Sequence, residues 1–246
     1  MKHVRGYQEL FEARTPLTPE QIKWLDMWTS GNWFRNPETG LVDIEGDFKV
    51  HRQDLTDFKG VRFGKVDGNF DCSYNRITSL DGAPQEVGNN FHCYDNQLTT
   101  LDGGPSIVKW DYNCSRNNLA SLKDAPKLVN GYFDCSRNFL TSLEDAPDWI
   151  GGYFAFPKNR IVSLKGLPEH IGRRAEFYEN PVSVHTLSLL YNSMRSGMSW
   201  EEAVEMHWDN LKNEEDMLLL ASSNPRLSKD EIEEFQALVN MNRRAI

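Results

Sequence analysis

The sequence predicts an α/β solenoid, in which a parallel sheet with irregular convex arms is stacked between an N-terminal helical cap and a C-terminal helical cap. Three observations predict it: an apolar pattern that recurs at constant spacing between Val66 and Val182, a helix start signal before the repeats, and helical periodicity after them. A fixed period of about 21 residues is typical of solenoids, because one repeat cannot bury its own apolar face and must stack on its neighbours.

Each repeat combines an aromatic slot, a second apolar slot, an asparagine, two aliphatic residues, a proline and a final aliphatic residue. One copy reads Phe91, Cys93, Asn96, Leu98, Leu101, Pro105 and Val108. Phe91 and Cys93 alternate with a polar residue, which predicts a half-buried strand. We therefore expect parallel strands near residues 70–72, 91–93, 112–114, 133–135 and 154–156. The arm after the asparagine has no helical period, so we expect irregular or polyproline-like backbone there.

The asparagine slot predicts a structural ladder through the repeats. A buried amide can satisfy backbone groups where the chain leaves a strand, so asparagines in register would bond successive repeats together. The expected ladder is Asn75, Asn96, Asn117, Asn138, Asn159 and Asn180.

All the cysteines occupy one slot of successive repeats: Cys72, Cys93, Cys114 and Cys135. Disulfides or a zinc site are the alternatives, but zinc sites favour close pairs such as C-x₂-C, whereas each of these thiols belongs to a different repeat. We expect a column of separate, buried, reduced thiols and no metal.

These repeats resemble the leucine-rich repeat family, whose core reads L-x-x-L-x-L-x-x-N-x-L. The segment 91–98 fits from the second leucine onward, whereas Val87 lies one place early and Gly88 occupies its slot. The short period and the Leu-Thr-Ser-Leu phrase are most similar to the bacterial effector subclass and its phage-encoded relatives. The resemblance implies a non-enzymatic, protein-binding module, phage-encoded in origin, that recognises a host or phage protein through its strand face in the host cytoplasm.

The chain divides into a leader or flexible N-terminus (1–15), a capping helix and loop (16–40), repeats (41–183) and a helical region (184–246). Thr18, Pro19 and Gln21 form a strong helix start with a capping box. A tryptophan-rich cluster follows, and it is expected to cover the end of the core, with a ligand cage as the alternative: Trp24, Trp28, Trp33 and Phe34. Residues 41–63 are expected to form a degenerate entry repeat. Its apolar residues lie 22 positions before the corresponding residues of the first full repeat, instead of the regular 21.

Residues 7–13 resemble the capsid-targeting leader of internal head proteins in T-even-type phages. Those leaders carry a Tyr-Gln-Glu core and end in a (Leu/Ile)-x-Glu site. Leu10 and Glu12 match that site, which would place cleavage between Glu12 and Ala13. The resemblance implies a head-associated, packaged virion protein, located in the phage head. The alternative is an ordinary N-terminus that is not processed.

The region 184–246 predicts helices that begin at Thr186, Ser199, Glu214 and Ser228 and cap the solenoid. A polar terminal cap keeps a solenoid soluble. The sequence contains no phosphate loop, H-E-x-x-H or G-x-S-x-G motif, so neither an enzyme nor a cofactor is expected. A cryptic enzyme in these C-terminal helices is the remaining catalytic alternative.

The formal net charge is −9, which argues against nucleic-acid binding because that binding requires a positive patch. Nucleic-acid mimicry is the alternative. No segment approaches the roughly 20 apolar residues of a membrane span, so no membrane association is expected.

Function is expected on the exposed strand face, whose outward positions form three rows. The upstream row is Asn69, Asn90, Asp111, Tyr132, Tyr153 and Arg174; the central row is Asp71, His92, Asn113, Asp134, Ala155 and Glu176; the downstream row is Ser73, Tyr94, Ser115, Ser136, Pro157 and Tyr178. The candidate binding residues are Asp71, His92, Tyr94, Asp111, Tyr132, Asp134, Tyr153, Arg174 and Tyr178. Rigid aromatics dominate interface energies, which favours a binding role for the tyrosines, although tyrosine also suits half-exposed strands without any partner.

Overall fold

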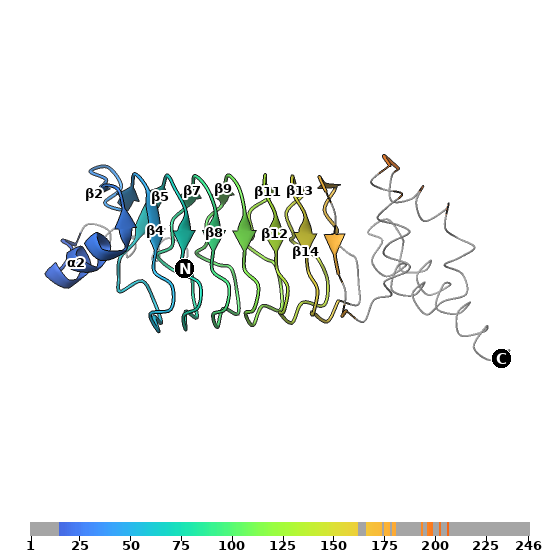
Figure 1. The fold of residues 1–246 in the computed structure, drawn as a ribbon, viewed down its shortest axis with the longest axis horizontal. Helices are drawn as coiled ribbons and strands as arrows, with labels where there is room; N and C mark the ends of the chain where they lie inside the picture. Colours follow the sequence, from blue (N-terminus) through green and yellow to red (C-terminus); the bar gives the residue numbers. More distant parts are fainter. Residues whose placement is uncertain are drawn as a thin grey trace, which may run out of the picture.

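The computed structural model describes residues 15–161, 166–173, 175–177, 179–180, 193, 196–198, 202 and 206. The repeats form an elongated stack of rungs, and each regular rung contributes one short strand to each of two sheets (Figure 1). We call these sheets A and B. Each has eight strands, and the apolar core lies between them.

Sheet A contains the strands expected from the aromatic slots. Its strands in spatial order are β1 (Thr29–Ser30), β4 (Asp47–Lys49), β6 (Phe70–Asp71), β8 (Phe91–His92), β10 (Tyr112–Asn113), β12 (Phe133–Asp134), β14 (Phe154–Ala155) and β16 (Ala175–Glu176). Phe91 pairs with Tyr112 and Tyr112 pairs with Phe133, so neighbouring strands are parallel and one repeat apart in the sequence. β1 differs, because it pairs antiparallel with β4. The predicted parallel strands, with buried aromatic and cysteine slots, are confirmed.

Sheet B corrects the expectation that the convex arms are wholly irregular. Its strands in spatial order are β15 (His170–Ile171), β13 (Trp149–Ile150), β11 (Leu128–Val129), β9 (Ile107–Val108), β7 (Glu86–Val87), β5 (Phe63–Val66), β3 (Val42–Ile44) and β2 (Trp33–Arg35). The strands after β3 run parallel to one another, and β2 pairs antiparallel with β3. Most of these strands are only two residues long, which is too short to show alternation in the sequence.

The early position of Val87 follows from this second sheet. Val87 is the inward residue of β7, and the chain then bends at Gly88 before it enters β8. A Cβ atom on Gly88 would lie 2.1 Å from the carbonyl oxygen of Asp67, so glycine is required where neighbouring rungs approach. Between the asparagine and the proline of each rung the arm has no strand, as expected, and Leu98 and Leu101 are fully buried.

The core is a column of aromatic rings that runs along the stack. Neighbouring ring centroids are 5.7 Å apart for Phe70 and Phe91, 5.1 Å for Phe91 and Tyr112, and 5.4 Å for Tyr112 and Phe133. Tyr112 is fully buried, and its hydroxyl has no hydrogen-bond partner among the described residues. An unpaired buried hydroxyl costs stability, so this position is a weak point of the column.

The asparagine slots form hydrogen bonds that tie each rung to the one before it. The Oδ1 atom of Asn117 accepts from the Leu98 N–H at 3.0 Å, and its Nδ2 donates to the carbonyls of Cys93 (3.0 Å) and Cys114 (3.1 Å). The same arrangement is made by Asn75, Asn96, Asn138, Asn159 and Asn180. These amides supply buried backbone groups with partners that the short strands do not provide.

The cysteines are free and buried, with one on each of four rungs: Cys72, Cys93, Cys114 and Cys135. The thiol of Cys93 lies 3.5 Å from the carbonyl oxygen of Asn113 on the next rung and donates to it. Burial raises the pKa of the Cys93 thiol well above its ordinary value. Among the described residues no group of side chains could hold a metal ion.

A helix closes the N-terminal end of the core. Helix α2 (Pro19–Trp28) begins with the predicted capping box, in which Thr18 accepts from the Gln21 N–H and the Gln21 side chain accepts from the Thr18 N–H. Trp24 is buried and packs edge-on against Phe48, with ring centroids 5.1 Å apart. Trp28 and Trp33 pack partly buried against the core, whereas Phe34 is exposed, so most of the predicted cluster covers the end of the solenoid.

The entry repeat contains its extra residue in β5. Val42 pairs with Phe63, as the regular period requires, but Ile44 pairs with Val66, one position beyond that period, so a bulge lies between the two pairs. Asp43 accepts from the Lys65 N–H at 2.8 Å inside this bulge. The extra position predicted for residues 41–63 is thereby located at a single irregularity.

The proposed leader at 1–12 and almost all of the region 184–246, including its expected helices, lie outside the described residues. Within the part of the chain that the structure describes, no helix is long and apolar enough to cross a membrane.

Candidate functional site

The outer face of sheet A brings together several of the residues expected to bind a partner. Asp71, His92 and Asp134 occupy equivalent outward positions of β6, β8 and β12. Asp111 and Tyr132 precede their strands by one residue, whereas Tyr94 follows β8 by two. Because β-strand side chains alternate, these positions place polar and aromatic groups on one surface.

The aromatic side chains on this face form a continuous band. The Tyr132 and Tyr153 rings stack with centroids 5.0 Å apart and planes 10° apart. The Tyr132 hydroxyl lies 3.4 Å from Nε2 of His92. His92 in turn meets the Tyr94 ring at 6.0 Å, and Tyr94 meets Tyr74 at 5.0 Å, both edge to face. We define the aromatic band as Tyr74, His92, Tyr94, Tyr132 and Tyr153.

Tyr74 is a residue of this band that the sequence reasoning missed. It lies outside the alternating strand positions, in left-handed backbone with φ of 53°. The guanidinium of Arg52 lies 4.6 Å from the centroid of its ring. The sequence signal for it was that Tyr74 and Tyr94 lie just before the slot asparagines of two successive repeats. Because Tyr74 lies in a turn, strand alternation does not predict where its side chain points.

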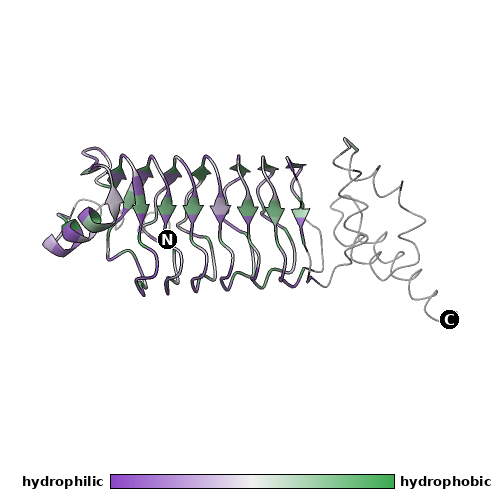
Figure 2. Ribbon diagram, viewed as in Figure 1, coloured by the Kyte–Doolittle hydropathy of each residue, from purple (hydrophilic) through white to green (hydrophobic). Residues whose placement is uncertain are grey.

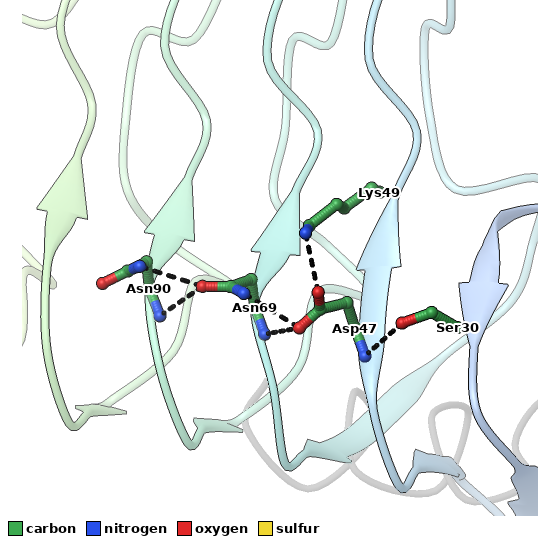
Figure 3. Close-up of polar contacts among 5 residues, drawn as sticks. All are labelled: Ser30, Asp47, Lys49, Asn69 and Asn90. Carbon is green, nitrogen blue, oxygen red and sulfur yellow. Dashed lines mark hydrogen bonds and ion pairs between the residues drawn. The ribbon is translucent and has the colours of Figure 1, made fainter.

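A second ladder of hydrogen bonds fixes the upstream edge of this face (Figure 3). The Oδ1 atom of Asp47 accepts from the Asn69 N–H at 2.7 Å, and Oδ1 of Asn69 accepts from the Asn90 N–H at 3.3 Å. Asn90 accepts from the Asp111 N–H at 3.0 Å, and Asp111 accepts from the Tyr132 N–H at 2.9 Å. The backbone beneath the aromatic band is therefore held by side-chain bonds in addition to strand pairing.

Electrostatics differ between the two ends of this ladder. Burial pushes the pKa of Asp47 upward, but hydrogen bonds from the Asn69 N–H and from Lys49 outweigh it and hold that pKa below its ordinary value. Burial raises the pKa of Tyr132 to about 12, so its hydroxyl stays protonated at neutral pH and can donate.

Burial also controls the central row. It lowers the pKa of His92, with a further contribution from Lys49, although the Asp71 and Asp111 carboxylates oppose this shift. His92 is therefore neutral at pH 7. Burial raises the pKa of Asp134, against hydrogen bonds from Ser136. A positively charged partner group would favour the ionised form of Asp134, so the carboxylates of this face suit a cationic ligand.

Not every outward position reaches solvent. Ala155 and Pro157 are buried, as are Ser73 and Ser115 of the downstream row. Ser73 bonds through its N–H and its hydroxyl to Asp71, and Ser115 bonds in the same way to Asn113, so both serines are turned toward the central row. These positions are corrections to the three-row expectation. Arg174 and Tyr178 lie outside the described residues.

Comparisons with known proteins leave this face without an assigned role. No protein-family model matches the chain, and no curated protein matches it. Among solved structures, a Shigella effector leucine-rich-repeat domain is similar, with 17% sequence identity over 78% of this chain and 92% of that domain, and a TM-score of 0.42. A similarity at that level assigns no family. The fold class of the chain accordingly stands on its own strand pairing: a solenoid with two sheets, which are parallel except for their N-terminal edge strands β1 and β2.

Proposed function

We propose that this chain is a non-enzymatic binding module that recognises a protein through the outer face of sheet A. The observation that carries this proposal is the aromatic band, in which the contact between His92 and Tyr132, two rungs apart, joins the Tyr74–Tyr94 pair to the Tyr132–Tyr153 pair. Tyrosines held in fixed positions lose little conformational entropy on binding, which is why they are frequent at interface hot spots.

The partner is proposed to present a basic segment. Carboxylates of Asp71, Asp111 and Asp134 lie beside the band, and Glu176 continues the central row. The side chain of Lys49 is partly neutralised by its 2.6 Å ion pair with Asp47. An acidic aromatic surface complements lysine and arginine side chains, through charge and through cation–π contacts with the tyrosine rings.

The cysteines do not supply a catalytic nucleophile. The thiols of Cys72, Cys93, Cys114 and Cys135 are fully buried and their pKa values are raised by that burial, so they are poor nucleophiles. A cryptic enzyme in the C-terminal helices would need residues outside this face, and substitutions on the face would then leave its activity unchanged.

The test is a quantitative capture experiment from host lysate with the full chain as bait. Tyr94→Ala and the pair Tyr132→Ala with Tyr153→Ala should each reduce recovery of the same partner at least about 10-fold, as expected for hot-spot residues. Phe34→Ala is the matched control, because Phe34 is an exposed aromatic residue on β2 of the other sheet. Recovery should also fall as salt is raised, because salt screens attraction between an acidic face and a basic partner. Equal capture by all variants would contradict the proposal.

The second candidate is a packaged virion protein that is trimmed after Glu12. The observation that favours it is the segment 7–13, with Leu10 and Glu12 at the expected positions before Ala13. The two functions are compatible, because a head-delivered protein can bind a host protein after entry. Location in the phage head, rather than in the host cytoplasm alone, belongs to this candidate.

Mass spectrometry of particles from the source phage tests this candidate. A chain that begins at Ala13 supports it, and Glu12→Gln should block the trimming while leaving the fold unchanged. An intact Met1-initiated chain in the particles, or absence of the protein from them, would contradict it.

A further inference from the structure

The outer face of sheet B carries a second surface feature, which we call the sheet B row: Glu86, Ile107, Leu128, Trp149 and His170. These residues lie side by side on β7, β9, β11, β13 and β15. The exposed fractions of its three central side chains are 51% for Ile107, 50% for Leu128 and 46% for Trp149. Of the short strands of this sheet, β9 and β11 consist of hydrophobic residues only (compare the green strands in Figure 2), and the row lies on the opposite sheet from the aromatic band.

The fold does not require apolar side chains at these positions. The inward partners on the same strands, Val108, Val129 and Ile150, are buried and fill the core. Polar residues would serve equally well on the outward side of an exposed sheet. The three adjacent apolar residues at the centre of the row, Ile107, Leu128 and Trp149, nevertheless remain exposed, which indicates a contact surface.

We propose that two copies of this chain pack through the sheet B row, with their solenoid axes pointing in opposite directions. In this dimer a two-fold axis parallel to the strands passes beside Leu128. Leu128 then contacts the same residue of the other copy, and Ile107 contacts Trp149. The ends of the row bring Glu86 against His170.

Charge selects this arrangement over the alternative. Two two-fold arrangements keep the strands of the two sheets aligned: one has its axis along the strands and the other along the solenoid. An axis along the solenoid places every rung on its own equivalent, so that Glu86 faces Glu86. An axis along the strands instead pairs that carboxylate with the imidazole of His170. Like charges across an interface are costly, and a carboxylate–imidazole contact is favourable.

The contacts within each copy leave the row ready to pack. The rings of Trp149 and His170 stack with centroids 3.6 Å and planes 11° apart, so both are fixed before association. Lys65 and Lys109 lie 4.0 and 3.6 Å from Glu86 and hold its carboxylate at the edge of the row. In the dimer Lys127 would approach Lys127 of the other copy. Asp148, whose carboxylate lies 4.0 Å from the Lys127 ammonium, partly neutralises that charge.

The size of the row sets the expected affinity. Four steps of about 4.8 Å place Glu86 and His170 about 19 Å apart. An interface of this length falls in the small class, below about 1,200 Å² in total, which is typical of weak association. We therefore expect a dimer with a dissociation constant in the micromolar range, about 10 to 100 μM.

Sedimentation velocity over a concentration series tests the association. The full chain should shift from monomer to dimer, and Leu128→Asp should weaken dimerisation about 100-fold, because both copies lose the leucine and gain facing carboxylates. Leu128→Thr keeps a strand-forming residue and should weaken it by a smaller factor. Met27→Asp, on an exposed helical side chain, is the matched control and should dimerise normally. A wild-type chain that stays monomeric up to about 500 μM overturns the proposal, whatever else occupies the face.

Cysteine cross-linking tests the orientation, since the native thiols are buried and do not compete. Ile107→Cys mixed with Trp149→Cys should form a disulfide-linked pair on oxidation, whereas neither variant should cross-link with itself. Self-linking of Ile107→Cys would overturn the opposed arrangement. The proposal is independent of the function assigned to sheet A: Tyr132→Ala should leave dimerisation unchanged, and Leu128→Asp should leave partner capture unchanged.

Discussion

Replacement of Asn117 by alanine should destabilise the solenoid by about 2–4 kcal/mol. The Leu98 N–H loses its side-chain acceptor at 3.0 Å and is left unpaired in a buried setting, which costs about 1–3 kcal/mol. The carbonyls of Cys93 and Cys114 keep one amide donor each, from Asn96 and Asn138, so their loss is smaller. The cavity left by the amide adds roughly 1 kcal/mol.

Asn117→Asp separates the roles of the two ends of the amide. A carboxylate still accepts from the Leu98 N–H, but it faces the carbonyl oxygens of Cys93 and Cys114 without a donor. The folded chain can avoid a buried charge by keeping this carboxyl protonated. That protonation costs about 1.4 kcal/mol for each pH unit above the unfolded pKa of about 3.9, so the destabilisation at pH 7 cannot exceed about 4 kcal/mol. Lowering the pH toward 4 should restore most of the loss, since a protonated carboxyl donates one hydrogen bond to these carbonyls where the amide donates two.

Urea unfolding followed by circular dichroism and tryptophan fluorescence measures these changes. Asn118→Ala and Asn118→Asp are the matched controls, because Asn118 is the adjacent residue but is exposed. Both controls should stay within about 0.5 kcal/mol of the wild-type free energy of unfolding. An Asn117→Ala protein equally close to wild type, or an Asn117→Asp protein that does not recover in acid, would refute the ladder as a source of stability.

Three further predictions concern buried groups. Tyr112→Phe removes a hydroxyl that has no partner among the described residues, so it should stabilise the fold by about 1–3 kcal/mol in the same unfolding assay. Asp134→Asn should stabilise the protein at neutral pH, because burial raises the folded pKa of Asp134 and ionisation of this carboxyl therefore opposes folding. The gain in unfolding free energy should vanish below the unfolded pKa of the aspartate. A gain that stays constant across pH would contradict this cause. The thiols should resist a thiol reagent in the folded chain and react only on unfolding; these are Cys72, Cys93, Cys114 and Cys135. A disulfide among them, or zinc bound to the purified protein, would contradict this prediction.

The sequence predicted sheet A well because its signal is repeated. Phe91 and Cys93 recur in identical chemical slots of successive repeats, and the strands, their direction and their buried residues followed from that period. Sheet B was missed because a two-residue strand has no alternation to detect. The signal that could have revealed it was the pair of apolar residues before the bend in successive repeats, such as Ile107 with Val108 and Leu128 with Val129.

The candidate face was predictable in position but not in connectivity. Strand alternation placed His92 and Asp134 outward, yet it could not show that His92 reaches Tyr132 two rungs away. Nor could it show that the hydrogen bonds of Ser73 turn that side chain inward toward Asp71. Such contacts depend on rotamers and on left-handed turn residues such as Tyr74, which a pattern of residue types does not contain.

Because neighbouring regular rungs pair one repeat apart, the solenoid can be shortened or lengthened by removing or adding whole repeats. Excision of residues 112–132 would join Asp111 to Phe133, which occupies the slot that Tyr112 vacates. Asn138 would then meet Leu98 in the way that it now meets Leu119, so the deletion would leave no broken bond in the ladder. The solenoid would shorten by one step of about 4.8 Å, and helix α2 would still cover the N-terminal end of its core. A surface built this way can be lengthened or shortened by whole repeats, and so matched to targets of different span without redesign of its core.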